Sequence, residues 1–425
     1  MRRVFSFVST VALGCGSQTD APTAADAALA DAAIPGDASA PDADATRDDR
    51  CARDLDAGDA TRFVAPLDAG TDAALRPPQI VWNGGAVLAH PVVVPVTFDG
   101  DPLRASIEQA VATIGCTSWW RAFAGDYGVG DAIAGAPVHV ATPPPAMADD
   151  GDIRKWIADH VTSGALPKPD GNTVYALFHP DGATTTYNGA ESCKGFYGYH
   201  DVTVVKGRYA PYMVVPRCGD LGVTTAVLSH ELAEAVTDPM LNGFANVADD
   251  DVAWELVRAS EVADMCNTIG NGHIVPPDFP FTVQRIWSNR AAFLGQNPCV
   301  PADGTTWFVA VPVVSDRVGA TLFGPMVAGR GVRLAVGSST TIDVRLQSTA
   351  PTGGWSFSAE DRGGSATDPD LTFSFDKTFG REGDVLRLTI TRVKANATFG
   401  ASPFIVRSKA NAQDHVWIAM VGDAP

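Results

Sequence analysis

The segment from Gly219 to Pro239 constrains the fold of this chain most, because it predicts one long helix that carries clustered acidic side chains. Its apolar residues recur at helical spacing, namely Leu221, Val223, Val227, Leu228, Leu232 and Val236. Asp220 can cap the start of the helix, and Asp238-Pro239 ends it. Within it lies the sequence Ser229-His230-Glu231-Leu232-Ala233-Glu234, an HExxE motif.

The HExxE motif suits a metal site. Positions i and i+4 lie one above the other on a helix, so His230 and Glu234 can bind one cation from the same face. Glu231 lies beside that face. The related HExxH motif of metallopeptidases binds zinc through two histidines and uses its glutamate as general base. A glutamate in place of the second histidine makes the site harder and more negative, which fits Zn²⁺ and also admits Ca²⁺ or Mn²⁺.

The distribution of glutamate points to the same region. Acidic residues number 49, but only eight are glutamate, and four of these are Glu231, Glu234, Glu255 and Glu261. No Lys or Arg occurs between Arg217 and Arg258, so the helix lacks the i,i+4 cationic partners that usually accompany acidic residues. A bound cation would neutralise these carboxylates. The alternative is an inert, solvated helix face.

A second acidic segment follows the helix. Glu261 and Asp264 are three residues apart and can share a helical face, so either can supply a third ligand. His179 and His200 are weaker candidates that could line a cleft, and His200 could be a fourth ligand; each is otherwise a packed residue. Tyr197 or Tyr199 could stabilise an oxyanion. The run Asp249-Asp250-Asp251 is expected to be a solvated loop rather than a second ion site.

The HExxE motif, followed by Asp238-Pro239 and by the segment Glu261 to Cys266, resembles the EXORDIUM (phosphate-responsive) proteins of plants and their bacterial relatives. Further matches are Asn83-Gly84, Trp119-Trp120, Gly198-Tyr199-His200 and the Cys266/Cys299 pair, so that the resemblance covers roughly residues 80–300. It implies an extracellular, zincin-like α/β domain in which His230 and Glu234 are ligands, Glu261 or Asp264 is the third, and Glu231 is the base. It implies no known reaction.

The N-terminus resembles a bacterial lipoprotein signal peptide over residues 1–15. A basic start is followed by an apolar stretch of eleven residues, Val4 to Gly14, which is too short to span a bilayer. Ala12-Leu13-Gly14-Cys15 is similar to a lipobox and implies cleavage before Cys15 and a lipid on its thiol. The alternative is an ordinary secretory peptide. We expect a protein of the cell envelope, lipid-anchored in the outer membrane or at the cell surface, or secreted.

Residues 16–76 predict a disordered tether. They are rich in Ala and Asp and almost lack aromatic residues, so they cannot bury enough apolar surface to offset the entropy of ordering. Beyond the signal peptide, six cysteines suggest disulfides in an oxidising compartment. We favour the pairs Cys266–Cys299 and Cys193–Cys218, because each would close one contiguous segment, and Cys51–Cys116 then follows by elimination.

Two folded domains are expected after the tether. Residues 77–303 predict an α+β domain, with strands at 92–98, 172–178 and 212–216 and helices at 103–114, 153–161 and in the HExxE segment. Trp119 and Trp120 are expected in its core. Residues 304–425 predict an all-β, Ig-like sandwich of seven strands, at 307–314, 333–336, 340–346, 371–375, 385–391, 404–407 and 416–421.

The function predicted from these features is that of an envelope-tethered, metal-dependent hydrolase. It would be peptidase-like, with Zn²⁺ at an HExxE…ExxD site and a peptide or cell-wall polymer as substrate. The alternative is a non-catalytic surface-binding protein with a structural ion. The net charge of −18 and the absence of a Lys/Arg cluster exclude a nucleic-acid partner. We expect a monomer whose sole membrane contact is a lipid on Cys15.

Overall fold

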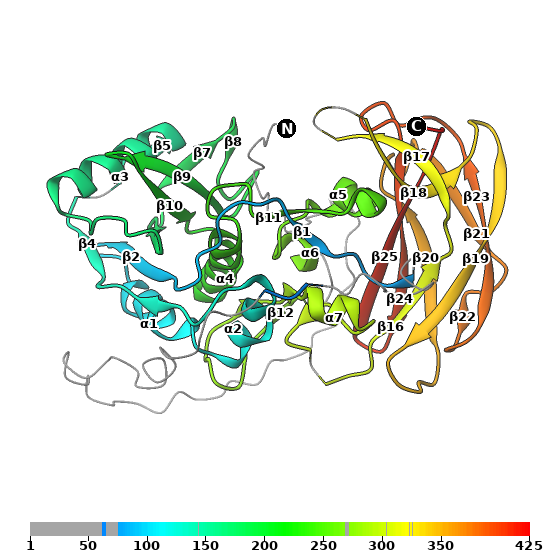
Figure 1. The fold of residues 1–425 in the computed structure, drawn as a ribbon, viewed down its shortest axis with the longest axis horizontal. Coiled ribbons are helices and arrows are strands. Elements are labelled where there is room, and N and C mark those ends of the chain that lie inside the picture. Colours follow the sequence, from blue (N-terminus) through cyan, green and yellow to red (C-terminus); the bar gives the residue numbers. More distant parts are fainter. Residues whose placement is uncertain are drawn as a thin grey trace, which may run out of the picture.

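The computed structural model describes residues 62–64, 75–142, 144–267, 272–302, 304–322, 324 and 326–425 (Figure 1). The predicted signal peptide, the expected lipid attachment site Cys15 and most of the predicted tether lie outside the described residues. The fold of these ranges is mixed α+β and mostly β. None of the helices in these ranges combines the length and the apolar character that a bilayer crossing requires.

A six-stranded sheet organises the first part of the fold. Its strand order is β3-β2-β6-β10-β9, and β4 also pairs with β2. The central strands run parallel, and β9 is antiparallel to β10. The strand bounds are β2 (Val92–Phe98), β3 (Ile133–Ala134), β4 (Val138–Val140), β6 (Thr173–Phe178), β9 (Tyr199–Val205) and β10 (Arg208–Val215). The strands expected at 92–98, 172–178 and 212–216 are therefore confirmed.

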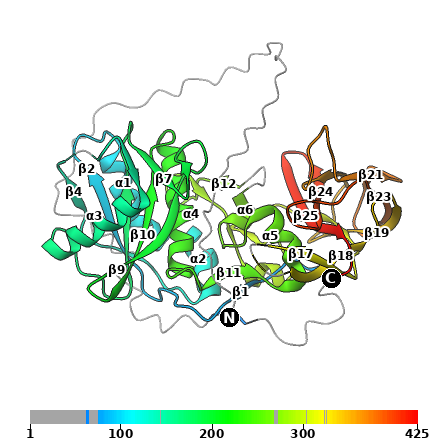
Figure 2. The same ribbon diagram turned by 90° about the horizontal axis from the view of Figure 1, so that it is seen from above.

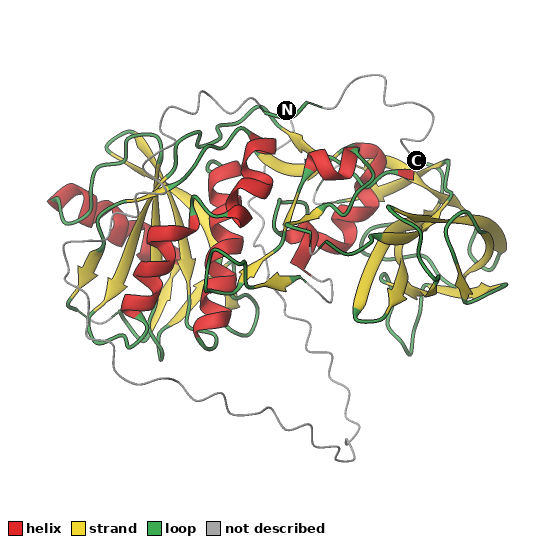
Figure 3. Cartoon of the chain, turned by 90° about the horizontal axis from the view of Figure 1, so that it is seen from below, coloured by secondary structure: helices red, strands yellow, loops and turns green. Residues whose placement is uncertain are grey.

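Helices cover both faces of this sheet (Figure 3). The helices α1 (Arg104–Ile114) and α4 (Leu221–Thr237) pack on one face, where Val93 and Met213 belong to the same apolar cluster as α4. The helix α3 (Asp150–Ser163) packs on the other face, against Val94 and Val214. Successive strand residues point to opposite faces, so the central strands β2 and β6 are buried on both sides and lack the alternation of a half-exposed strand.

Short elements complete the part of the fold before the C-terminal strands. Their bounds are β1 (Ile80–Trp82), α2 (Ser118–Phe123), η2 (Ala124–Tyr127), β5 (Met147–Asp149), β7 (Thr184–Tyr187), β8 (Ala190–Glu191), β11 (Phe244–Val247), η3 (Asp249–Asp251), α5 (Val252–Arg258), α6 (Asp264–Asn267), β12 (His273–Ile274), β13 (Val283–Gln284), β14 (Ile286–Trp287), α7 (Asn289–Phe293) and β15 (Cys299–Val300). The pairs β1–β11, β12–β13 and β14–β15 are antiparallel.

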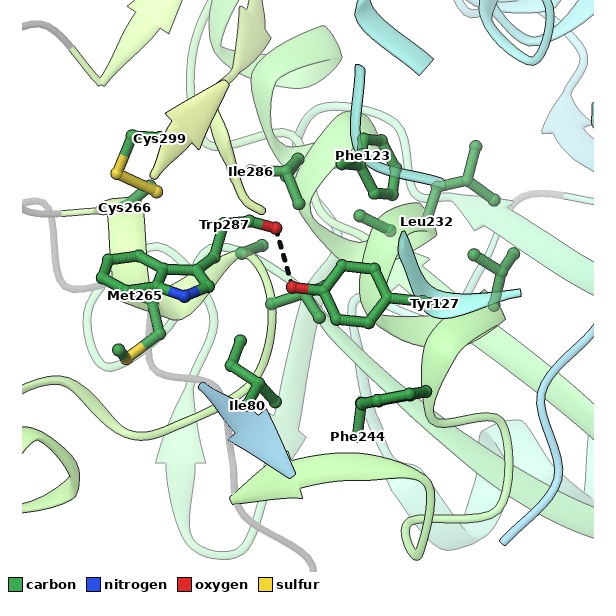
Figure 4. Packing of buried hydrophobic residues seen from close by; sticks show 14 of the residues in the cluster. Ile80, Phe123, Tyr127, Leu232, Phe244, Met265, Cys266, Ile286, Trp287 and Cys299 are labelled. Carbon is green, nitrogen blue, oxygen red and sulfur yellow. Dashed lines mark hydrogen bonds between the residues drawn. A yellow bond between two sulfur atoms is a disulfide. The ribbon is translucent and has the colours of Figure 1, made fainter. Parts of the chain in front are cut away.

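An apolar cluster ties η2, α6 and β14 to α4 (Figure 4). It joins Leu232 of α4 to Met265 of α6, and the hydroxyl of Tyr127 donates to the carbonyl oxygen of Trp287 at 2.8 Å. Trp119 and Trp120 are fully buried in the same cluster, as expected. The relative position of α4 and α6 is therefore set by buried side chains.

The C-terminal part consists of two sheets packed face to face around a shared apolar core. Their strand orders are β16-β19-β23-β21 and β17-β18-β25-β24-β20-β22. The bounds are β16 (Phe308–Pro312), β17 (Asp316–Thr321), β18 (Met326–Arg333), β19 (Ser339–Ser348), β20 (Trp355–Asp361), β21 (Leu371–Phe375), β22 (Phe379–Gly380), β23 (Val385–Arg392), β24 (Ser402–Ala410) and β25 (Gln413–Gly422).

The structure corrects the strand prediction in this part. The sequence predicted seven strands, whereas the described residues form ten, and the strand expected at 333–336 instead ends at Arg333. That strand, β18, contains Gly329 and Gly331, which lower the apparent strand propensity. A Cβ on Gly331 would lie 2.7 Å from the carbonyl oxygen of Met420, so a close backbone approach requires this glycine.

The sandwich packs against α5 (Figure 2). Trp254 of α5 lies between Trp287 and Trp417, at ring-centroid distances of 5.7 and 5.8 Å. The acidic run at 249–251 forms η3, and Asp249 and Asp250 are exposed, as expected for a solvated segment; Arg317 pairs with Asp250 and Arg330 pairs with Asp251. The run therefore also contacts the sandwich, through ion pairs with one arginine of β17 and one of β18.

Two of the expected disulfides are present. Cys193 is bonded to Cys218, and Cys266 is bonded to Cys299. Cys51, the expected partner of Cys116, lies outside the described residues. Within the expected tether, the backbone N–H of Phe63 donates to the carbonyl oxygen of Asp126 at 3.0 Å. This short part of the tether therefore lies on the folded domain.

Candidate metal centre

Helix α4 places the HExxE motif inside the protein. Its N-terminus is capped by Asp220, whose carboxylate accepts the backbone N–H of Val223, and it ends at Thr237, as predicted. The side chains of His230, Glu231 and Glu234 are 1%, 0% and 0% exposed. The alternative of a solvated helix face is therefore wrong. Uncompensated charges in such a position would be strongly unfavourable.

The acidic segment around α6 faces the same motif. Nε2 of His230 lies 3.3 Å from Oε2 of Glu234 and 3.7 Å from Oδ1 of Asp264. The backbone N–H of Asp264 donates to Oε1 of Glu234 at 3.2 Å. Ligand atoms about 2.1 Å from a tetrahedral ion are about 3.4 Å apart. The spacing of His230, Glu234 and Asp264 therefore fits three ligands of one cation.

The chain bends sharply to bring this segment in. Ala259, which follows α5, has φ of 53°, a left-handed conformation that is strained for a residue with a side chain. Glu261 follows two residues later and is 6% exposed. The Cys266–Cys299 disulfide then ties α6 to β15.

His200 joins the cluster from β9. Its Nε2 lies 3.4 Å from Oε1 of Glu261, and its Nδ1 lies 3.7 Å from both Oε2 of Glu231 and Oε2 of Glu234. The described donors thus form two three-residue groups that share Glu234. In each group, the donor atoms lie within 4.8 Å of one another. One group is His230, Glu234 and Asp264; the other is His200, Glu234 and Glu261.

A residue that sequence reasoning missed orients His230. Oε1 of Gln284, in β13, lies 3.0 Å from Nδ1 of His230. The amide nitrogen of Gln284 donates to the carbonyl oxygen of Ala263 at 2.7 Å, which identifies Oε1 as an acceptor. Nδ1 of His230 is therefore the donor, and Nε2 is presented to Glu234 and Asp264. No motif in the sequence marks Gln284, because its role depends on β13 packing against α4.

In the described part of the chain, the three glutamates of the cluster have histidines as their basic partners. Glu231, Glu234 and Glu261 lie within ion-pair distance of histidines alone, and Asp238 forms no ion pair there. Burial raises the pKa of Glu261 well above its usual value, and the surrounding carboxylates raise it further. Burial opposes ionisation of Glu234 as well, but the charge of His230 outweighs it and lowers the pKa of Glu234.

The histidines are protonated by this environment when no cation is present. Burial alone would lower the pKa of His200, but Glu231 and Glu234 raise it to about 9. Burial likewise opposes the charge on His230, but Glu234 and Glu231 raise its pKa to about 10. Several polar atoms still have no hydrogen-bond partner among the described residues: both ring nitrogens of His200, Nε2 of His230, both oxygens of Glu231, Oε2 of Glu234, Oδ2 of Asp238 and Oε2 of Glu261. Buried polar atoms are normally satisfied, so this donor set fits a cation.

The side chain of Glu231 packs closely against Gly198. A Cβ on Gly198 would lie 2.7 Å from Oε1 of Glu231 and 2.5 Å from Cγ1 of Val227. A side chain at position 198 would therefore displace Glu231. This contact gives a physical reason for the glycine in the Gly198-Tyr199-His200 sequence.

The remaining candidates lie outside the cluster. His179 is buried, and its Nδ1 lies 3.0 Å from the hydroxyl of Thr185. The hydroxyl of Tyr199 donates to Asp150 at 2.9 Å. Both are therefore satisfied inside the first part of the fold, and neither belongs to a donor group of the cluster. Tyr197 packs against the apolar cluster around α4.

Comparison with known proteins assigns this chain to no family. No family model matches it, and no curated protein does. Overlapping solved structures include the titin M3 domain (15% identity, 28% of this chain and 99% of that chain, TM-score 0.16) and the titin M4 trigonal form (12%, 28% and 99%, TM-score 0.16). The twitchin kinase region from C.elegans overlaps at 17% identity, with 27% and 16% covered and a TM-score of 0.15. Likenesses this slight assign neither fold nor function.

Proposed function

We propose that this protein is an envelope-tethered, metal-dependent hydrolase that acts on a peptide or cell-wall polymer. Its first domain would be zincin-like, as the resemblance to EXORDIUM proteins implies, and its second would be Ig-like. The observation that carries the proposal is the buried group of His230, Glu234 and Asp264. Its donor atoms are spaced as ligands, and both of its carboxylates are buried beside the imidazole of His230.

His230, Glu234 and Asp264 would hold the ion, and Zn²⁺ suits this mixed nitrogen and oxygen donor set. When bound, the cation would supply Lewis-acid polarisation of a carbonyl and lower the pKa of a water. Glu231, neither of whose oxygens has a hydrogen-bond partner among the described residues, would take a proton from the water that attacks the carbonyl carbon. That proton would pass to the leaving amine as the C–N bond breaks, which restores the Glu231 carboxylate.

Metal analysis combined with a base variant tests this proposal. Purified protein should contain a divalent cation, and His230→Ala should lose it. Glu231→Gln should keep the ion while cleavage of a peptide or cell-wall polymer library falls at least 100-fold, a typical contribution of a general base. Unchanged cleavage by Glu231→Gln would remove Glu231 as the base. An intact fold without metal in the wild-type protein would refute the hydrolase.

A non-catalytic surface protein with a structural ion is the second candidate. The complete burial of Glu231 and Glu234 favours it, because a catalytic base must reach its substrate. In that case, a chelator would unfold the domain, as happens when metal binding is part of the folding free energy. A chelated protein that keeps its circular dichroism spectrum, loses its activity and regains it with Zn²⁺ would instead support the hydrolase.

A further inference from the structure

The buried cluster holds more donors than one ion requires. His230, Glu234 and Asp264 complete one group, and His200 with Glu261 remains on its other side. Structural zinc sites use four ligands, and catalytic sites use three protein ligands and one open position. The question is therefore what His200 and Glu261 bind.

His200 is the most informative of these residues. It is 3% exposed, and neither of its ring nitrogens has a hydrogen-bond partner among the described residues. A buried histidine normally satisfies at least one nitrogen, because an unsatisfied polar atom costs about 1–3 kcal/mol. Its nearest polar neighbours are carboxylate oxygens at 3.4 and 3.7 Å. These separations exceed those of charge-assisted hydrogen bonds, and one donor atom each of His200, Glu234 and Glu261 lie within 4.8 Å of one another, close enough to bind one ion.

Glu234 connects the two groups through one atom. Its Oε2 lies 3.3 Å from Nε2 of His230 and 3.7 Å from Nδ1 of His200, while Oε1 accepts the backbone N–H of Asp264. The carboxylate is thus fixed on one side and faces both histidines on the other. Carboxylates that lie between two donor sets in this way are suited to two-metal sites, in which the ions are about 3.5–4 Å apart.

The negative charge of the buried cluster also favours a second cation. Five carboxylates are buried in the cluster, those of Glu231, Glu234, Asp238, Glu261 and Asp264. One divalent ion supplies two positive charges and so offsets fewer than half of these carboxylates when all five are ionised, in a region shielded from water where such an excess is unfavourable. A second divalent ion would reduce the excess without any basic side chain.

We propose that His200 and Glu261, together with Glu234, form a second divalent-cation subsite, so that the centre binds two ions bridged by Glu234. The proposal deepens the proposed function, on which it rests for the first ion. The second subsite offers one imidazole and two carboxylates, a donor set that suits Zn²⁺ or Mn²⁺.

Metal stoichiometry tests the second subsite without reference to activity. The full chain is stripped with a chelator, titrated with Zn²⁺ or Mn²⁺, and counted by calorimetry and by elemental analysis. Wild-type protein should bind two equivalents, and His200→Ala should bind one. With Mn²⁺, the wild-type electron paramagnetic resonance spectrum should show a coupled ion pair, and the spectrum of His200→Ala should show an isolated ion. His179→Ala is the matched control, because His179 is also buried but lies outside the cluster; it should keep two equivalents.

A second variant guards against misfolding of His200→Ala. Glu261→Gln keeps the size of the side chain and should also reduce the count to one. The second subsite is refuted if wild-type protein binds one equivalent, with an isolated-ion spectrum, or if Glu261→Gln still binds two. One equivalent in wild-type protein that is lost in His230→Ala leaves the proposed function standing. No binding by folded wild-type protein refutes both.

Discussion

Nδ1 of His230 donates to Oε1 of Gln284 over 3.0 Å, and this contact fixes which ring nitrogen faces the acidic cluster. Gln284 is itself held in place, because its amide nitrogen donates to the carbonyl oxygen of Ala263 and its backbone N–H donates to the hydroxyl of Ser229 at 2.8 Å. The histidine therefore presents Nε2 to Glu234 and Asp264 without rotating. Such outer contacts orient metal-binding histidines and raise their basicity.

Replacing Gln284 with Met should weaken metal binding 10- to 100-fold, the usual effect of losing an outer partner of a ligand. The imidazole would lose its acceptor and could rotate or change tautomer, while the apolar side chain would fill a similar volume. Competition with a chromogenic chelator measures the change in the dissociation constant. Gln109→Met, on an exposed position of α1, serves as the control and should bind metal as the wild-type protein does. Equal affinities for the two variants would show that Gln284 does not orient His230.

The metal-free protein should lose stability as the pH rises above 7. His200 and His230 have folded-state pKa values of about 9 and 10, above the unfolded value of 6.5. Their contribution is therefore fully present below pH 6.5 and is lost as the pH rises through 9 and 10. The slope should approach about 1.4 kcal/mol per pH unit for each histidine. Urea unfolding at pH 7, 8 and 9, in the presence of a chelator, measures it.

Bound metal should remove this pH dependence, because ligand histidines are neutral and the cation replaces their protons. Affinity should also rise between pH 7 and 9, with proton release that calorimetry detects in buffers of different ionisation enthalpy. His179 does not interfere, since burial lowers its pKa to about 4 and it stays neutral across this range. A flat stability profile in the metal-free protein would mean that the two histidines are not held protonated by the carboxylates.

Local sequence patterns were sufficient for the elements that carry the site. Helical spacing, the Asp220 cap and the Asp238-Pro239 stop predicted α4 to its ends, since each signal is local to the helix. The pairs Cys193–Cys218 and Cys266–Cys299 were also predicted, because each closes a contiguous segment. The α+β class of the described residues likewise followed from local periodicity.

Contacts between distant segments were harder to predict. His200 looked like a weak candidate because its neighbours in sequence carry no metal-binding pattern, and its place beside Glu261 arises from the packing of β9 against α4. The position predicted for β18 was wrong because strand propensity disfavours Gly331. The backbone there lies too close to Met420 for a residue with a side chain, and this contact between distant segments is not visible in the local sequence.

Removing the Cys266–Cys299 disulfide should lower both stability and metal affinity. The bond closes a segment with a sequence separation of 33 residues, which corresponds to about 3–4 kcal/mol in the chain-entropy description. It also anchors α6, which carries Asp264, so the double variant Cys266→Ser/Cys299→Ser should bind metal more weakly. Urea unfolding and chelator competition measure the two effects. Lower stability with unchanged metal affinity would show that packing of Met265 is enough to hold Asp264 in place.

Gly198→Ala should abolish general-base catalysis by Glu231 and leave the metal bound. The added Cβ would lie 2.5 Å from Val227 and 2.7 Å from Glu231, so one of these side chains must move. Overpacking of this kind costs about 1–3 kcal/mol of unfolding free energy. Cleavage should fall as in Glu231→Gln, with an unchanged metal count. Gly125→Ala is the matched control, because a Cβ there meets no atom within 4 Å, and it should keep full activity. If Gly198→Ala cleaved substrate at the wild-type rate, Val227 rather than Glu231 would have moved away from the added Cβ, and the glycine would not be needed for the position of Glu231.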